Sequence, residues 1–169
     1  SNVDHIVANS NYTKNLAIDL GVQEEKIVVI NPGVDPMSEV PQKYLDEAED
    51  ILKGKKNRLI TVSRFDKRKN HEKVIMAVRN LKEIYPDIIY TCIGYGDEEE
   101  KLKKLVIELK LEDQVTFLKD IPSDLKNALV AKSDIFVMPS IIYKKSVEGF
   151  GIAYVAVSYT HLTLPTILL

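Results

Sequence analysis

The sequence predicts an α/β fold of the Rossmann-like, three-layer kind, with a mostly parallel sheet and helices on both faces. Two observations lead to this prediction. Short β-branched runs that are apolar almost throughout alternate with longer amphipathic segments, and several of the amphipathic segments open on a residue that commonly caps helices. Because strands that alternate with helices are joined by right-handed crossovers, the strands are expected to be parallel and the helices to cover both faces.

The expected strands share a nearly continuous apolar character. That pattern is typical of strands buried on both faces, as in a parallel sheet between two helical layers. They are residues 5–9 (HIVAN), 26–30 (KIVVI), 58–63 (RLITVS), 87–94 (DIIYTCIG), 114–118 (QVTFL) and 134–139 (DIFVMP).

The expected helices have legible starting residues. Asp97 is followed three places on by Glu100, which is the spacing of a capping box with an acidic first turn. Residues 35–57 are expected to form a loop and a polar helix, with prolines limiting the helix. The predicted capping residues are Ser10, Asn70, Asp97 and Ser123.

Composition limits the class of protein. The chain has 169 residues, 45% of them hydrophobic, which is enough for one domain with its own core. The net charge of −2 gives no reason to expect a nucleic-acid surface. The single cysteine, Cys92, lies in an apolar run and is expected to be a small buried side chain in a reducing compartment. Without a leader or a long apolar stretch, a cytoplasmic location is expected.

Ligands of such sheets bind beyond the carboxyl ends of the strands, and one junction there carries cations. Arg64 follows a predicted strand directly, and Lys69 lies beside the cap of the next helix. A guanidinium and an ammonium at a helix start suit a diphosphate, because the helix N-terminus adds N–H donors. The alternative is a solvated basic loop, which this stretch by itself does not exclude.

Two further junctions are rich in glycine. Gly94 and Gly96 bracket the exit from a strand, either as a plain tight turn or as a backbone turn near a ligand. They do not complete a dinucleotide motif, because Glu99 occupies the place of the third glycine. The third junction holds Glu148, Gly149, Phe150 and Gly151 at a helix start. There, backbone N–H groups could face an anion and the carboxylate could accept hydroxyl groups, although a glutamate at a helix start also simply suits the helix dipole.

Together these stretches resemble the carboxyl-terminal, donor-binding domain of a GT-B retaining glycosyltransferase of family 4, the glycosyl transferases group 1. The resemblance covers residues 3–155 and depends on the order and spacing of the motifs, none of which suffices alone. The first 35 residues resemble the passage between the two domains of that family, with NPGVD where NGVD is common. The other motifs are VSRFDKRKNH, CIGYGDEEEKL, QVTFLKDIPSDLKNALVAKSDIFVMPS and EGFGIAYV.

The resemblance implies roles for individual residues. Arg64 and Lys69 would hold the donor diphosphate and neutralise the leaving group, so that no metal and no other cofactor is expected. Glu148 would be the catalytic contact to the donor sugar, and residues 149–151 would close on the phosphates or the sugar. Ile121 would be an apolar contact of the nucleobase, in a loop where Lys119 replaces a frequent glycine.

The implied reaction transfers a hexose from a nucleoside-diphosphate sugar to an acceptor with retention at the anomeric carbon. The acceptor site belongs to an amino-terminal domain that is missing here, so donor binding without turnover is expected, and a peripheral membrane association through that domain is left open. A non-catalytic nucleotide-sugar-binding module and a GT-B sugar-nucleotide epimerase are the alternatives.

The end of the chain departs from the family pattern. A second glutamate is expected eight places after Glu148, to bind the ribose, but Ala156 stands there. The binding domain is therefore assigned to residues 1–155. Residues 156–169 are expected to be a non-native tail that resembles translated vector sequence, or else a divergent terminus, and to pack poorly from Val157 onward.

Overall fold

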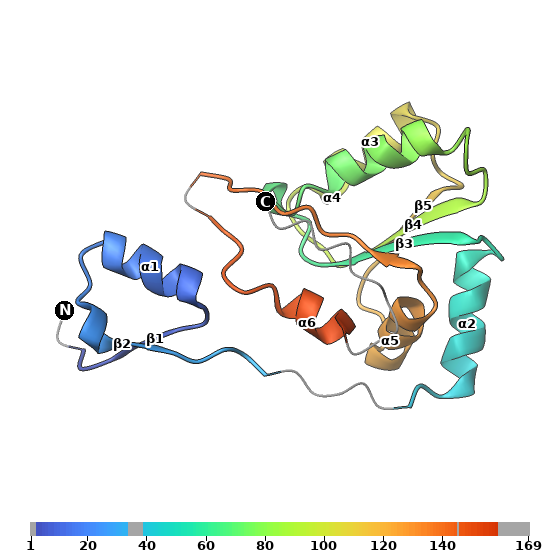
Figure 1. Cartoon of the computed structure of the whole chain (residues 1–169). Coiled ribbons are helices and arrows are strands. Elements are labelled where there is room, and N and C mark those ends of the chain that lie inside the picture. Colours follow the sequence, from blue (N-terminus) through green and yellow to red (C-terminus); the bar gives the residue numbers. More distant parts are fainter. Residues whose placement is uncertain (1–2, 34–38, 145, 159–169) are drawn as a thin grey trace.

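The computed structural model describes residues 3–33, 39–144 and 146–158. Its strands confirm the predicted α/β fold, and each of them lies within or next to a segment expected from the sequence (Figure 1). The strands are β1 (Ile6–Ala8), β2 (Ile27–Val29), β3 (Asn57–Val62), β4 (Ile88–Ile93), β5 (Val115–Leu118) and β6 (Ile135–Phe136).

The strands form two parallel sheets. The larger sheet has four strands in the order β5-β4-β3-β6, and its neighbouring strands are all parallel. The smaller sheet pairs β1 with β2, also in parallel, with Val7 opposite Val28. Figure 1 shows the smaller sheet with α1 (Asn11–Asp19) at one end of the molecule, beside the carboxyl-terminal segment that carries α6 (Ile152–Ser158).

Helices cover both faces of the larger sheet, as expected for a three-layer fold. On one face, α2 (Gln42–Leu52), α5 (Ser123–Ala131) and α6 contribute to a first core. On the other face, α3 (His71–Leu81) and α4 (Glu99–Glu108) contribute to a second core. Two short 3-10 helices, η1 (Glu24–Lys26) and η2 (Lys67–Lys69), complete these elements.

The central strand β4 shows why the apolar runs predicted strands buried on both faces. All six of its residues are buried. Alternate side chains point to opposite sides of a strand, so Ile89 and Ile93 pack in the first core while Tyr90 and Cys92 pack in the second. Cys92 is fully buried, and burial raises the pKa of its thiol far above the usual value. Its observed position is that of a small core side chain.

The first two predicted helix starts are confirmed in position. Ser10 caps α1, and its hydroxyl accepts the N–H of Thr13 at 3.1 Å, while the Thr13 hydroxyl accepts the N–H of Ser10 at the same distance. Asn70 precedes α3 in the left-handed backbone conformation, but its side chain makes no capping hydrogen bond. Its amide instead donates to the carbonyl oxygen of Pro139 at 3.3 Å.

The other two starts differ from the prediction. The residue before α4 is Glu98, and no side-chain hydrogen bond caps this helix, so the capping box of Asp97 and Glu100 does not form. Backbone contacts take its place, since the N–H of Glu98 bonds to the carbonyl oxygen of Phe65. Likewise Pro122 precedes α5, and Ser123 is its first helical residue.

The carboxyl-terminal residues include a packed helix. In α6, Val157 is 3% exposed and belongs to the first core, so at this residue the expectation of poor packing is wrong. Ala156 lies on the same helix and is half-buried. Residues 159–169, where most of the expected tail falls, lie outside the described residues.

Candidate functional site

The topology places a crevice between β3 and β6. From β3 the chain proceeds outward through β4 and β5, and then returns to add β6 on the other side of β3. In open parallel sheets, ligands bind at such a switch point, beyond the carboxyl ends of the two strands. The segments that leave these ends are residues 63–70 after β3 and residues 137–151 after β6.

The segment after β3 turns two of its three consecutive cations, Arg68 and Lys69, toward the site. Asp66 precedes η2, and its carboxylate accepts the N–H of Lys69 at 3.0 Å. The left-handed residue Asn70 then ends the turn. As a result, Lys69 is only 9% exposed, and its ammonium group lies 3.3 Å from the sulfur of Met138, just after β6.

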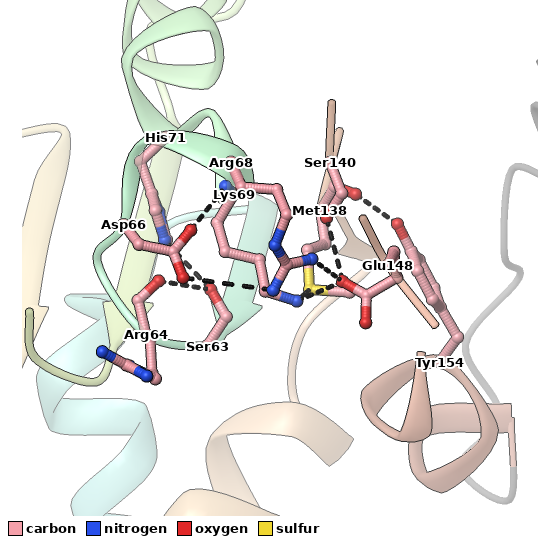
Figure 2. A network of polar contacts seen from close by, with 10 residues as sticks. All are labelled: Ser63, Arg64, Asp66, Arg68, Lys69, His71, Met138, Ser140, Glu148 and Tyr154. Carbon is pink, nitrogen blue, oxygen red and sulfur yellow. Dashed lines mark hydrogen bonds and ion pairs between the residues drawn. The ribbon is translucent and has the colours of Figure 1, made fainter. Parts of the chain in front are cut away.

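Glu148 joins the two segments through a cluster of polar contacts (Figure 2). Its Oε2 atom accepts from Arg68 Nη1 at 2.6 Å, from Ser140 Oγ at 3.2 Å, and from the ammonium group of Lys69. Burial would raise the pKa of this carboxyl, but hydrogen bonds and charges from Lys69 and Arg68 lower it below the usual value. Glu148 is therefore an anion held by two cations.

A pocket of about 230 Å³ adjoins this cluster. Lys69 and Glu148 line it together with the backbone turn at residues 149–151, so charged groups and the glycine-containing turn face one space. Gly151 has a φ of 77°, which favours glycine, and α6 begins directly after it at Ile152. The helix thus starts later than the sequence predicted. The residues that line the pocket are Asn9, Lys69, Met138, Glu148, Gly149, Phe150, Gly151, Ile152 and Ala153.

The structure brings some of the predicted site residues together and separates others. Lys69, Glu148 and residues 149–151 meet at the pocket, although about 80 positions separate them in the sequence. Arg64 is exposed, and Figure 2 shows its guanidinium group pointing away from Glu148. Ile121 is partly buried against the first core and does not line this pocket.

Gly94 and Gly96 have a packing reason of their own. A Cβ atom on Gly94 would lie 2.0 Å from the carbonyl oxygen of Ser63, and one on Gly96 would lie 2.5 Å from that of Phe65. No side chain fits at these distances, so the two glycines let the loop after β4 lie against the loop after β3. The structure thus gives these glycines a packing role against the protein's own backbone, and a contact between this turn and a ligand stays a prediction.

Sequence reasoning missed two contributors to the site. Arg68 pairs with Glu148 and its side chain is 16% exposed, although no feature of the sequence favours it over its neighbours. Ser10, in the segment resembling an interdomain passage, donates from its hydroxyl to the carbonyl oxygen of Gly149 at 2.5 Å. The family spacing points to Arg64 and Lys69, and no signal marks Arg68, because the direction in which each of three consecutive basic side chains faces is not written in the sequence.

A chain of hydrogen-bonded polar side chains connects the segment after β3 to the second core. Ser63 Oγ is 3.0 Å from His71 Nε2, His71 Nδ1 is 2.9 Å from the Tyr90 hydroxyl, and that hydroxyl is 2.8 Å from Thr61 Oγ1. Burial lowers the pKa of His71 to about 4, so the imidazole is neutral at neutral pH. His71 is the first residue of α3.

The described part of the chain has neither a metal-binding cluster nor a membrane-spanning helix. Residues 3–33, 39–144 and 146–158 contain no group of three or more His, Cys, Asp or Glu side chains placed to hold a metal ion. Across the same part of the chain, no helix has the length and apolar character needed to cross a membrane.

A parallel sheet with helices on both faces, and a cation and a glycine turn at its switch point, agree with the carboxyl-terminal half of a GT-B glycosyltransferase. The chain belongs to the family Glycosyl transferases group 1, whose model matches residues 44–159. A second model, Glycosyltransferase Family 4, matches residues 1–37. The first match extends through α6 and past the expected boundary at residue 155.

The curated relatives include proteins named as glycosyltransferases and mannosyltransferases. The amylovoran biosynthesis glycosyltransferase AmsK of Erwinia amylovora is 31% identical over 137 residues, which are 80% of this chain and 32% of that protein. A GDP-mannose-dependent α-(1-6)-phosphatidylinositol monomannoside mannosyltransferase of Mycolicibacterium smegmatis is 26% identical over 162 residues, 94% of this chain and 42% of that protein. The chain thus spans well under half the length of these relatives.

Solved structures agree with this fold. Anabaena Alr3699/HepE, solved in complex with UDP-glucose, superposes with a TM-score of 0.78 at 22% identity, over 96% of this chain and 44% of that one. A glycosyltransferase from Rickettsia africae superposes with a TM-score of 0.77 at 26% identity, over 95% of this chain and 43% of that one.

Proposed function

We propose that this chain is the donor-binding half of a glycosyltransferase that transfers a hexose from a nucleoside-diphosphate sugar to an acceptor, with retention of anomeric configuration. The observation that carries the proposal is the convergence of Lys69 and Glu148 with the Gly149–Gly151 turn around one pocket at the switch point of the sheet. Two relatives support the donor class, since one is named GDP-mannose-dependent and another was solved with UDP-glucose.

In this proposal Lys69 contacts the diphosphate. Its ammonium group is nearly buried, so a charge-assisted hydrogen bond to a phosphate oxygen would be weakly screened by water. As the bond to the sugar breaks, negative charge accumulates on the departing diphosphate, and a fixed cation stabilises that charge more than it stabilises the bound donor. Arg64 reaches the same diphosphate only if its exposed side chain turns toward the pocket on binding.

Glu148 accepts hydroxyl groups of the donor sugar in this proposal, and the backbone N–H groups of residues 149–151 close over the phosphates or the sugar. Ile121 remains the proposed apolar contact of the nucleobase. Ala156 stands where the family pattern has its second glutamate, so the ribose lacks a charged partner on α6 and weak binding is expected.

The remaining features of the function belong to the same proposal. The chemistry needs no metal or other cofactor, because the cations of the protein itself neutralise the leaving group. The acceptor is bound by an amino-terminal domain outside this chain, through which the complete protein could associate with a membrane surface. The proposed location is the cytoplasm, and the chain alone binds donor without turning it over.

Calorimetric titration tests the proposal with UDP, UDP-glucose, GDP and GDP-mannose. Either UDP and UDP-glucose or GDP and GDP-mannose should bind. Lys69→Ala should weaken that binding by about 1.5 to 3 kcal/mol, the range for a hydrogen bond to a charged group. Lys104→Ala removes the same charge from an exposed position on α4 and should leave the affinity unchanged within error. No binding by the folded wild-type chain, or equal effects of the two substitutions, would argue against a diphosphate site at Lys69.

A further inference from the structure

Both the side chain and the backbone of Arg68 contact the residues around it. Its Nη1 atom lies 2.6 Å from Glu148 Oε2, and its Nη2 atom lies 4.0 Å from Asp66 Oδ2. Its backbone carbonyl accepts the N–H of Ile141 at 2.8 Å, which ties the turn after β3 to the loop after β6. With a side chain 16% exposed, Arg68 is fixed by backbone and side-chain contacts alike.

The two oxygens of the Glu148 carboxylate have different surroundings. Oε2 accepts from Arg68, Lys69 and Ser140. Oε1 accepts no hydrogen bond from the residues that the structure describes, and no dashed line reaches it in Figure 2. Glu148 also lines the pocket. One oxygen is thus anchored by the protein, while the other is left for a hydroxyl group of a ligand.

The two cations on Oε2 are not equivalent in chemistry. The ammonium group of Lys69 is a compact charge with three hydrogens, which can serve Glu148 and a phosphate oxygen together. The guanidinium group of Arg68 is planar and directional, and it cannot lose its proton. If Arg68 were absent, Lys69 would be the only cation on Glu148, and the carboxylate would compete with a diphosphate for it.

We propose that Arg68 is a positioning residue that anchors Glu148 through Oε2, so that Oε1 faces the sugar of the donor and Lys69 stays free to share its charge with the diphosphate. This inference rests on the proposed function. Its consequence is selectivity, since the anchored carboxylate gains hydroxyl partners from a nucleoside-diphosphate sugar and gains none from the bare nucleoside diphosphate. Arg68 therefore raises the preference of the site for donor over product.

The same turn offers a matched control. Lys67 is exposed and its ammonium group lies 5.1 Å from the centre of the Tyr143 ring, so it does not contact Glu148. Lys67→Gln and Arg68→Gln each remove one positive charge from neighbouring positions of η2. A general loss of positive charge would affect both variants equally, whereas loss of the anchor affects only the second.

The first test needs no nucleotide. The carboxyl carbon of Glu148 is followed by NMR during a pH titration, with Lys69, Arg68, Ser140 and Tyr154 as the groups around it. Arg68→Gln should move the titration midpoint upward by about one pH unit, because an opposite charge is lost, while Lys67→Gln should leave it in place. An unchanged midpoint in Arg68→Gln would overturn the anchoring role.

The second test measures selectivity by calorimetry, as the ratio of affinities for UDP-glucose over UDP and for GDP-mannose over GDP. Arg68→Gln should lower the ratio about tenfold, roughly the loss of one charge-assisted contact. Lys67→Gln should leave the ratio unchanged, and Arg68→Lys should restore part of it. Loss of affinity for both members of a pair by the same factor would overturn the selectivity. If the wild-type chain bound none of the four nucleotides, the proposed function and this selectivity would both be wrong. The anchoring of Glu148 by Arg68 is judged separately, from the midpoint of the NMR titration.

Discussion

His71 shows how a single side chain supports the site from beneath it. Its ring connects Ser63, on the segment that carries Lys69, to Tyr90 in the second core. The Phe65 ring meets it edge to face, with 4.9 Å between the ring centres. The neutral imidazole donates at one nitrogen and accepts at the other, and each hydroxyl group can take the complementary role, so both hydrogen bonds form with an uncharged ring, the state that burial favours.

Stability should therefore depend on pH through His71. Burial lowers its pKa from 6.5 to about 4, so between these values the unfolded chain binds a proton that the folded chain does not. The contribution is complete above pH 6.5 and is lost as the pH falls toward 4. The free energy of unfolding should decrease by roughly 2 kcal/mol from pH 7 to pH 5 because of this residue.

Urea denaturation at several pH values measures this decrease, and His71→Gln serves as the comparison. The variant should be less stable at pH 7 but should show a shallower decrease down to pH 5. Equal slopes in the two proteins would mean that other groups cause the pH dependence.

At the scale of single elements, two helices whose starts looked alike in sequence are capped differently. Ser10 caps α1 with its hydroxyl and also bonds to Gly149, in the wall of the pocket. Ser123 is already inside α5 and makes no capping hydrogen bond, because Pro122 occupies the cap position. The fixed φ of proline suits a helix entrance, so α5 starts one residue earlier than its serine suggested.

Ser10→Ala should lower the free energy of unfolding by about 1 kcal/mol, the usual effect of losing a cap hydrogen bond. Ser123→Ala should change it by less than about 0.5 kcal/mol, as for other surface substitutions. Denaturant titration of both variants against the wild type gives the two values, and comparable losses would contradict the assignment of the caps.

At the scale of the whole molecule, the two sheets differ in how well they are buried. Every residue of β4 is buried, between helical layers on both sides. In the smaller sheet, Val7 and Val28 face each other across the pair and are 64% and 46% exposed. Few buried apolar contacts mean a low free energy of local opening.

Hydrogen exchange should follow this difference. Backbone amides of β3 and β4 should exchange slowest, near the rate set by global unfolding, while those of β1 and β2 should exchange through a local opening of lower free energy. Exchange followed by NMR at a single pH gives both rates for the same sample. If β1 and β2 were protected as strongly as β4, the smaller sheet would be an equal part of one cooperative unit.

The layers of this protein, and the edge of the sheet at which its site lies, can be predicted from the amino-acid pattern alone. Continuous apolar runs between amphipathic segments leave little choice but buried parallel strands, as β4 shows, and parallel strands bring their carboxyl ends to one edge. The spacing of the motifs and the family resemblance predict that Lys69, Glu148 and the glycines beside it lie at that edge. These features depend on local pattern and chain order, which the sequence records directly.

Which basic side chains face Glu148 depends on the packing of distant segments against one another. Arg64, Arg68 and Lys69 all follow β3, but Asp66 and the left-handed Asn70 set the direction of the turn that points the last two inward. The close approach of the loops at Gly94 and Gly96 and the bond from Ser10 to Gly149 likewise join segments far apart in the chain. Such contacts are fixed by the packing of several elements at once, and no single segment of sequence carries that information.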